Sequence, residues 1–301
     1  MESNLKTLQK EQTPSLLKNI KLDFTPYLLL IPGLLWLFTF FILPILNLAT
    51  TSTKTRSASY ETGSFDQTWR FLNYVDAFVE NQDQFYRSFI YALIATLLAL
   101  AISYPLAYAI AFRSGAMKNI LLIMVIAPFF TSFLLRTLAW KQILGSQGPV
   151  VTVLQNLHIM KVGDTITATS FSVIMGLTYN FLPFMTLPIY ASLERIDPKL
   201  IEASGDLFAN GLNTFRKVTL PLSMPGVVAG TLLTFIPASG DYINASILGN
   251  PNTKMIGNVI DSRFFRVVDY PTAAALSFIL MAIILIIVSV YIRKTGTDEL
   301  V

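Results

Sequence analysis

Residues that commonly carry catalysis are scarce in this sequence. It contains one histidine, His158, and no cysteine, which excludes a multi-histidine or thiolate metal site and a disulfide framework. No G-x-x-x-x-G-K-[ST] phosphate loop is present, so the chain is not expected to hydrolyse ATP itself. The nearest match to a glycine-framed nucleophilic serine is Pro237-Ala238-Ser239-Gly240, in which proline replaces the first glycine. We therefore expect no catalytic residue and no metal or cofactor bound by this chain.

Two charged residues stand at the edges of long apolar runs. Arg136 is followed by Trp140, and Asp241 is followed directly by Tyr242. A carboxylate beside aromatic faces can hold ammonium groups by charge and by cation–π attraction, on the order of 0.5–2 kcal/mol per ring. The alternative is that the two charges pair with each other or with outer-loop groups while the aromatic side chains pack. Further candidates for a solute path are Tyr179, Phe181 and Phe184.

The composition shows which class of protein must position these residues. Of the 301 residues, 53% are apolar and 13% are charged, against roughly 25% charged in soluble domains. A membrane-spanning helix needs about 20 apolar residues. These observations exclude a soluble enzyme, a disordered chain and a nucleic-acid-binding domain, and predict an all-α polytopic membrane protein. The windows without Asp, Glu, Lys or Arg are 24–53, 88–112, 119–135, 165–193, 218–240 and 270–292.

Six membrane helices are expected from these windows. An even number places both termini on one side, and the higher density of Lys and Arg in the segments 1–23, 113–118, 194–217 and 293–301 favours the cytoplasm. The first helix follows a polar segment, 1–25, and is too long for a cleavable signal. Residues 51–87 are expected outside, 88–292 form a core of five spans with an inner loop at 194–217, and 293–301 form a tail. The expected spans are 26–50, 88–112, 119–141, 168–193, 217–240 and 271–292.

Prolines occur inside most of these spans, for example Pro105, Pro128, Pro183 and Pro225. Proline removes a backbone donor and tends to kink a helix. Membrane helices are ordinarily enriched in proline, which is one explanation. The other is a bundle of bent helices that open and close around a solute path.

The inner loop carries its own helix signals. Asp197-Pro198 is typical of a helix start, and Asn210-Gly211 is typical of a helix end. They predict a short helix near 198–209 and a second one near 212–217. Such a helix either docks into a groove of another protein or only seals the loop.

Residues of this loop resemble a known motif. Glu202-Ala203-Ser204, Asp206-Leu207-x-Ala209 and the following Leu220-Pro221 are similar to the EAA loop in the membrane subunits of binding-protein-dependent ABC importers. Ser204 replaces an alanine, and Phe208 replaces the glycine of the motif. Three further stretches, 182–190, 237–242 and 256–260, resemble the spermidine/putrescine permease branch, specifically the first of its two permease subunits.

The resemblance implies the type I importer (MetI-like) permease fold in a bacterial inner membrane. It implies a second, distinct permease chain, two ATPase subunits that hold ATP and Mg, and an external solute-binding protein. The solute would be a small organic cation such as spermidine or putrescine, and another small solute is the alternative. A stand-alone secondary transporter also suits six broken helices, but it has no use for an ATPase-docking loop. The residues implied to contact the ATPase are Glu202, Ala203, Ser204, Asp206, Leu207, Phe208 and Ala209.

Overall fold

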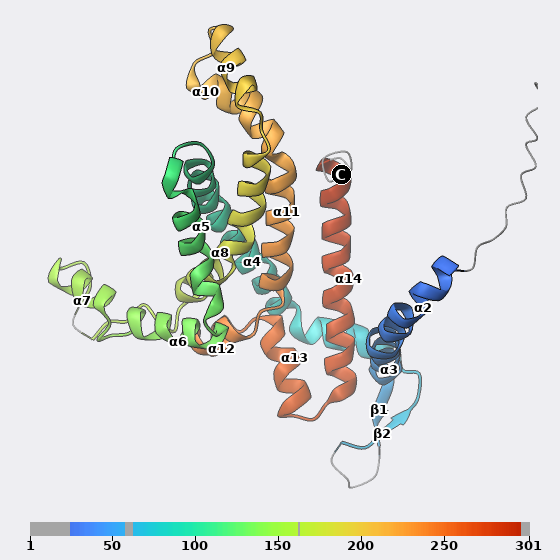
Figure 1. Ribbon diagram of the computed structural model, residues 1–301. Helices are drawn as coiled ribbons and strands as arrows, with labels where there is room; N and C mark the ends of the chain where they lie inside the picture. Colours follow the sequence, from blue (N-terminus) through green and yellow to red (C-terminus); the bar gives the residue numbers. More distant parts are fainter. Residues whose placement is uncertain (1–24, 58–62, 162, 296–301) are drawn as a thin grey trace, which may run out of the picture. The chain divides into compact units, whose positions relative to one another are not determined.

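The computed structural model describes residues 25–57, 63–161 and 163–295, which divide between two units, 1–48 and 49–301 (Figure 1). The described part of the first unit is helical: α2 (Thr25–Leu37) continues through a π-helical turn into α3 (Leu43–Ser52). Leu28–Ser52 is long and apolar enough to cross a membrane, as expected for the first span.

After the last turn of α3, the second unit continues with a short hairpin and a very long helix. β1 (Lys54–Arg56) and β2 (Phe65–Gln67) pair antiparallel. Helix α4 (Leu72–Phe112) starts well before the expected residue 88 and bends at Asn81, whose φ of −122° and ψ of 19° are not helical. In its first part, Ala77 and Phe85 are buried against the rest of the unit. A polar sequence therefore forms helix here through its buried apolar face.

The third expected span, 119–141, is wrong as a continuous helix. Residues Gly115–Phe130 and Phe133–Asn156 form a pair of helical segments bent by 96°. Pro128 lies in a 3-10 turn, and the next residues leave the helical region, with Thr131 at φ −87° and ψ 151°. The proline ring and the extended residues end one helix and start another. This pair comprises α5 (Lys118–Ile126), a 3-10 turn (Ala127–Phe130), α6 (Phe133–Leu144) and α7 (Pro149–Asn156).

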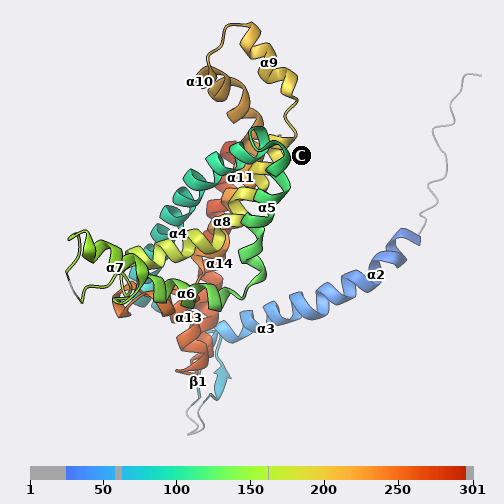
Figure 2. The same ribbon diagram turned by 60° about the vertical axis from the view of Figure 1, so that its left-hand side comes forward.

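Helices α4, α8 (Ser170–Glu194) and α11 (Leu220–Ser239) form the centre of the second unit and lie side by side in Figures 1 and 2. A glycine allows α8 and α11 to approach closely. A Cβ atom at Gly226 would lie 2.4 Å from the Pro188 carbonyl oxygen and 2.5 Å from the Ser192 hydroxyl oxygen. Small residues at such contacts are typical of helix packing in membranes.

The remaining helices lie at the two ends of this bundle or along it. Helices α9 (Pro198–Asp206) and α10 (Gly211–Thr214) extend beyond one end, and α12 (Ile243–Leu248) and α13 (Ile256–Phe265) lie at the other (Figure 1). Helix α14 (Tyr270–Thr295) packs against α4 and α13. Among the described residues, five helices can span a membrane, or six if the bent pair counts as one span. The all-α, multi-span expectation is thus confirmed.

Candidate coupling loop and solute path

The loop between α8 and α11 begins as the sequence predicts. The Asp197 carboxylate accepts a hydrogen bond from the Lys199 backbone N–H at 3.0 Å, and Pro198 occupies the first helical position. This cap satisfies one of the free N–H groups at the start of α9. Just before it, Ile196 is buried in the bundle and fixes the root of the loop.

Helix α9 ends in a motif that normally uses glycine. Phe208 has a φ of +57°, its N–H donates to the Gly205 carbonyl at 2.9 Å, and the Ala209 N–H donates to the Ser204 carbonyl at 3.0 Å. This pair of hydrogen bonds is a Schellman motif, whose left-handed residue is usually glycine. Phe208 therefore takes the left-handed conformation that glycine usually takes in this motif, and it carries a ring that is 98% exposed.

The end of the loop corrects one expectation. Asn210 does not end a helix: its side chain accepts a hydrogen bond from the Asn213 N–H at 2.9 Å and caps α10. Helix α10 then continues through a π-helical turn, Phe215–Thr219, directly into α11. The separate helix expected near 212–217 is therefore the first part of the next span. Asparagine suits both a helix end and an N-cap, so the dipeptide alone was ambiguous.

The seven expected ATPase-contact residues divide between two faces of this loop. Ser204 is turned inward, and its hydroxyl lies 2.8 Å from that of Thr214, which joins α9 to the end of α10. Ala209 is half-buried. The other five are exposed and line the outer surface of the loop: Glu202, Ala203, Asp206, Leu207 and Phe208.

The expected path residues on α6 and α8 lie together. Arg136 is 8% exposed, and its guanidinium stands 5.7 Å from the ring centre of Phe129 and 5.6 Å from that of Phe133. Its buried Nε atom has no hydrogen-bond partner among the residues that the structure describes. The cation is thus held by aromatic faces rather than by a carboxylate.

Aromatic rings continue this cluster along α8. The Trp140 and Tyr179 rings meet edge to face at 5.2 Å, and both side chains are half-buried. The neighbouring contacts are Phe129–Phe184 at 5.3 Å, Phe133–Phe181 at 6.2 Å and Phe181–Phe184 at 6.2 Å. Five of the seven expected path residues therefore belong to one surface between α6 and α8.

Asp241 and Tyr242 lie apart from this cluster, in the turn between α11 and α12. Within the described residues, no ion pair joins Asp241 to Arg136, so the two charges do not pair with each other. The Asp241 carboxylate is 8% exposed and accepts hydrogen bonds from the Asn244 backbone N–H at 2.8 Å and side-chain amide at 3.2 Å. Tyr242 is 45% exposed.

A buried polar network connects the two parts. The Asn180 side-chain amide donates to the Asn244 side-chain oxygen at 2.9 Å and to the Thr137 hydroxyl oxygen at 3.1 Å. All three side chains are fully buried, and the Asn180 Oδ1 atom has no partner in the described part of the chain. Sequence reasoning missed these residues, although an asparagine in the middle of an otherwise apolar span was an available signal.

Comparison with known proteins identifies the family. Residues 120–294 match the model of the binding-protein-dependent transport system inner membrane component. The PotB spermidine/putrescine permease protein of Escherichia coli K12 is 36% identical over 86% of this chain and 94% of its own. That of Haemophilus influenzae is 38% identical over 66% of this chain and 70% of its own.

Solved structures share the fold. A bacterial alginate ABC transporter in complex with alginate pentasaccharide-bound periplasmic protein has a TM-score of 0.70 at 19% identity, over 95% of this chain and 99% of its own. No group of three or more His, Asp or Glu side chains in the described residues is arranged to hold a metal ion. This chain belongs to the inner-membrane components of binding-protein-dependent ABC transport systems, as a non-catalytic permease subunit with the type I importer fold.

Proposed function

We propose that the chain forms half of the translocation path of an ATP-driven polyamine importer. Its relatives at 36–38% identity are named as spermidine/putrescine permeases, which supports this solute class. A second, homologous permease chain forms the other half. Two ATPase subunits hold ATP and Mg on the cytoplasmic side, where both termini of this chain also lie, and an external binding protein delivers the solute.

Coupling to the ATPase occurs through the exposed face of α9. The observation that carries this assignment is the outward surface of Glu202, Asp206, Leu207 and Phe208 on a loop whose inner face is tied to α10. A leucine and a phenylalanine that are 81% and 98% exposed offer apolar contacts to a groove. Movement of a docked ATPase reaches α11 directly, because α10 runs into it without an intervening loop.

A polyamine would enter at the turn that carries Asp241 and move inward along the aromatic surface between α6 and α8. The rings that hold the Arg136 guanidinium show the geometry by which aromatic faces accept a cation. Trp140 and Tyr179 present half-buried rings on the same surface. The Asp241 carboxylate supplies a negative charge at the end of this surface.

Coupling is tested in proteoliposomes that hold the complete transporter. Glu202→Arg and Phe208→Asp are expected to abolish ATP-driven uptake while the permease still inserts and folds, because both side chains point outward. Leu212→Gln, an exposed residue on the same loop outside the EAA-like motif, is the matched control and is expected to transport normally. Full uptake by both motif variants would exclude this docking surface.

Solute identity is tested by uptake of labelled spermidine, putrescine and other small organic cations. Asp241→Asn is expected to raise the apparent KM for spermidine, because the amide keeps the hydrogen bond from the Asn244 N–H but loses the charge. An unchanged KM and rate would remove Asp241 from the path. Uptake of a different solute class by the wild-type protein would select the alternative substrate and leave the permease role intact.

A further inference from the structure

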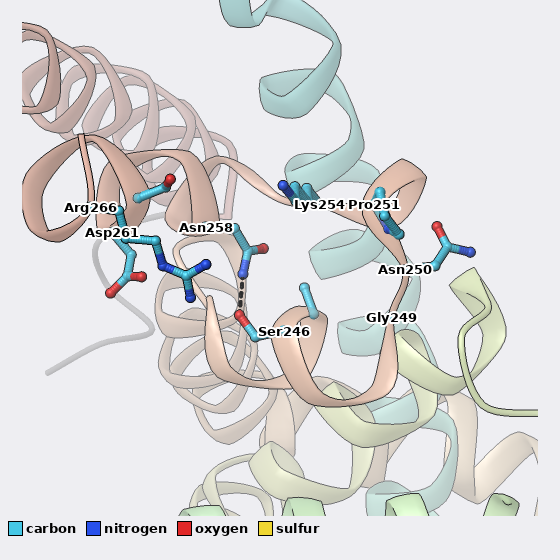
Figure 3. Close-up of a pocket in the computed structure, with 10 residues that line it drawn as sticks. Ser246, Gly249, Asn250, Pro251, Lys254, Asn258, Asp261 and Arg266 are labelled. Carbon is cyan, nitrogen blue, oxygen red and sulfur yellow. Dashed lines mark hydrogen bonds between the residues drawn. The ribbon is translucent and has the colours of Figure 1, made fainter.

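A polar pocket of about 260 Å³ lies between α12 and α13, at the opposite end of the bundle from α9. Ser246, Asn258 and Asp261 line it, together with two basic residues, Lys254 and Arg266. Figure 3 shows the Arg266 guanidinium extending toward Ser246 and Asn258. The pocket is therefore open, polar and lined by three charged side chains.

The charged side chains that line this pocket form no ion pairs within the described residues. Within residues 25–57, 63–161 and 163–295, neither Lys254 nor Arg266 nor Asp261 forms a salt bridge. Arg263, on the same helix, is paired with both Glu80 and Asp269. The unpaired set has one more positive than negative charge, so the pocket is electrostatically suited to an anion and repels an ammonium group.

A third cation stands beside the pocket. The Arg87 guanidinium donates to the Lys254 backbone carbonyl at 2.9 Å. This contact joins α4 to the turn before α13 and adds positive charge near Lys254. A polyamine entering the transporter would therefore be disfavoured here.

We infer that this pocket receives an acidic side chain of the external solute-binding protein. The inference rests on the proposed function, which places α12 and α13 on the external side of an importer. The net positive charge of this concave, solvent-accessible site matches a protruding carboxylate, and complementary charges of this kind steer and orient protein association.

Asn258 connects the pocket to the solute path. Its side-chain amide donates to the Ser246 hydroxyl at 2.7 Å and to the Tyr242 backbone carbonyl at 2.7 Å, and its oxygen accepts from the Met255 N–H at 2.9 Å. Tyr242 directly follows Asp241. A carboxylate bound by Arg266 would lie beside Asn258, which is bonded to the turn that holds Asp241, so docking is linked to the outer end of the path.

The test uses the complete transporter in nanodiscs with its spermidine-loaded binding protein. The measured quantity is the binding-protein concentration that gives half-maximal stimulation of ATP hydrolysis. Lys254→Glu and Arg266→Glu are each expected to raise it about tenfold, with Gln at either position giving a smaller rise, because the contact is charged and partly solvated. Lys161→Glu, an exposed basic residue outside the pocket, is the matched control and should leave it unchanged.

The outcomes separate the two proposals. No stimulation of the wild-type transporter by the binding protein would refute the proposed function itself. Normal stimulation of the wild type, with the same half-maximal concentration in the pocket and control variants, would overturn only the docking site. A changed response to spermidine without a change in binding-protein affinity would assign the pocket to the solute and overturn the inference as well. Recovery of Lys254→Glu by lysine at a single surface carboxylate of the binding protein would support it.

Discussion

The Lys118 ammonium nitrogen lies 2.6 Å from a carboxylate oxygen of Glu194, and this pair joins the first turn of α5 to the last turn of α8. Lys118 also stands 5.4 Å from the ring centre of Tyr190. Glu194 comes just before the Asp197 cap of α9. The bent segment that begins with α5 is therefore tied to the root of the proposed coupling loop.

Breaking this pair is expected to affect transport more than folding. The two side chains are 30% and 46% exposed, and solvent-exposed ion pairs add little to stability. We expect Lys118→Met and Glu194→Gln to leave the thermal unfolding midpoint nearly unchanged and to slow ATP-driven uptake. The charge swap Lys118→Glu with Glu194→Lys should restore uptake. If the swap is as slow as the single variants, the pair does not transmit loop movement.

Substitutions at Phe208 can separate the effect of its backbone conformation on transport from the effect of its side chain. Phe208→Gly removes the cost of the left-handed conformation, roughly 1 kcal/mol, whereas Phe208→Ala retains it. Both remove the exposed ring. If the ring is the ATPase contact, both variants should lose uptake to the same extent, although the glycine variant is the more stable by thermal unfolding. Normal uptake by Phe208→Gly alone would show that the conformation, not the ring, is required.

Gly226 tests the close contact between α8 and α11. Gly226→Ala is expected to destabilise the permease by about 1–3 kcal/mol, because the added methyl group overlaps the Pro188 carbonyl and the Ser192 side chain. Gly205→Ala is the matched control, since no atom lies within 4 Å of its added Cβ and alanine favours the helix. Thermal unfolding in the same lipid measures both. Equal stability of the two variants would contradict this packing.

The positive charge of Arg136 predicts how its removal changes the apparent KM for a cationic solute. Arg136→Met keeps much of the packing against Phe129 and Phe133 but removes a buried positive charge from the aromatic surface. We expect the apparent KM for spermidine to fall severalfold, because the solute no longer meets a like charge. Lys141→Met, an exposed change later in α6, serves as the control. The same KM in both variants would place Arg136 outside the path.

The coupling loop was largely predictable because its signals are local. Asp197 and Pro198 define the start of α9 through contacts with adjacent residues, and the structure follows them. The membrane-spanning segments were equally predictable, because a helix that crosses a bilayer requires a long apolar run. The misreading of Asn210 arose where one residue type fits two opposite roles.

The bend of the third span and the buried polar network were not predictable in the same way. Pro128 suggested a kink, but the direction change depends on Thr131 and Ser132 leaving the helical region. Asn180 is satisfied by Thr137 and Asn244, which come from other helices far along the chain. Only the packed bundle shows that these amides and hydroxyls meet.

The length of α4 has a mechanical consequence. At about 1.5 Å per residue, the part that follows the Asn81 bend reaches about 46 Å, whereas the hydrocarbon core is about 30 Å thick. This part of α4 is therefore longer than the hydrocarbon core is thick, and near its start Arg87 donates a hydrogen bond to the turn before α13. The turn before α13 is thus bonded to a continuous helix that runs into the bundle. A force applied to this turn is therefore transmitted directly to the bundle through α4.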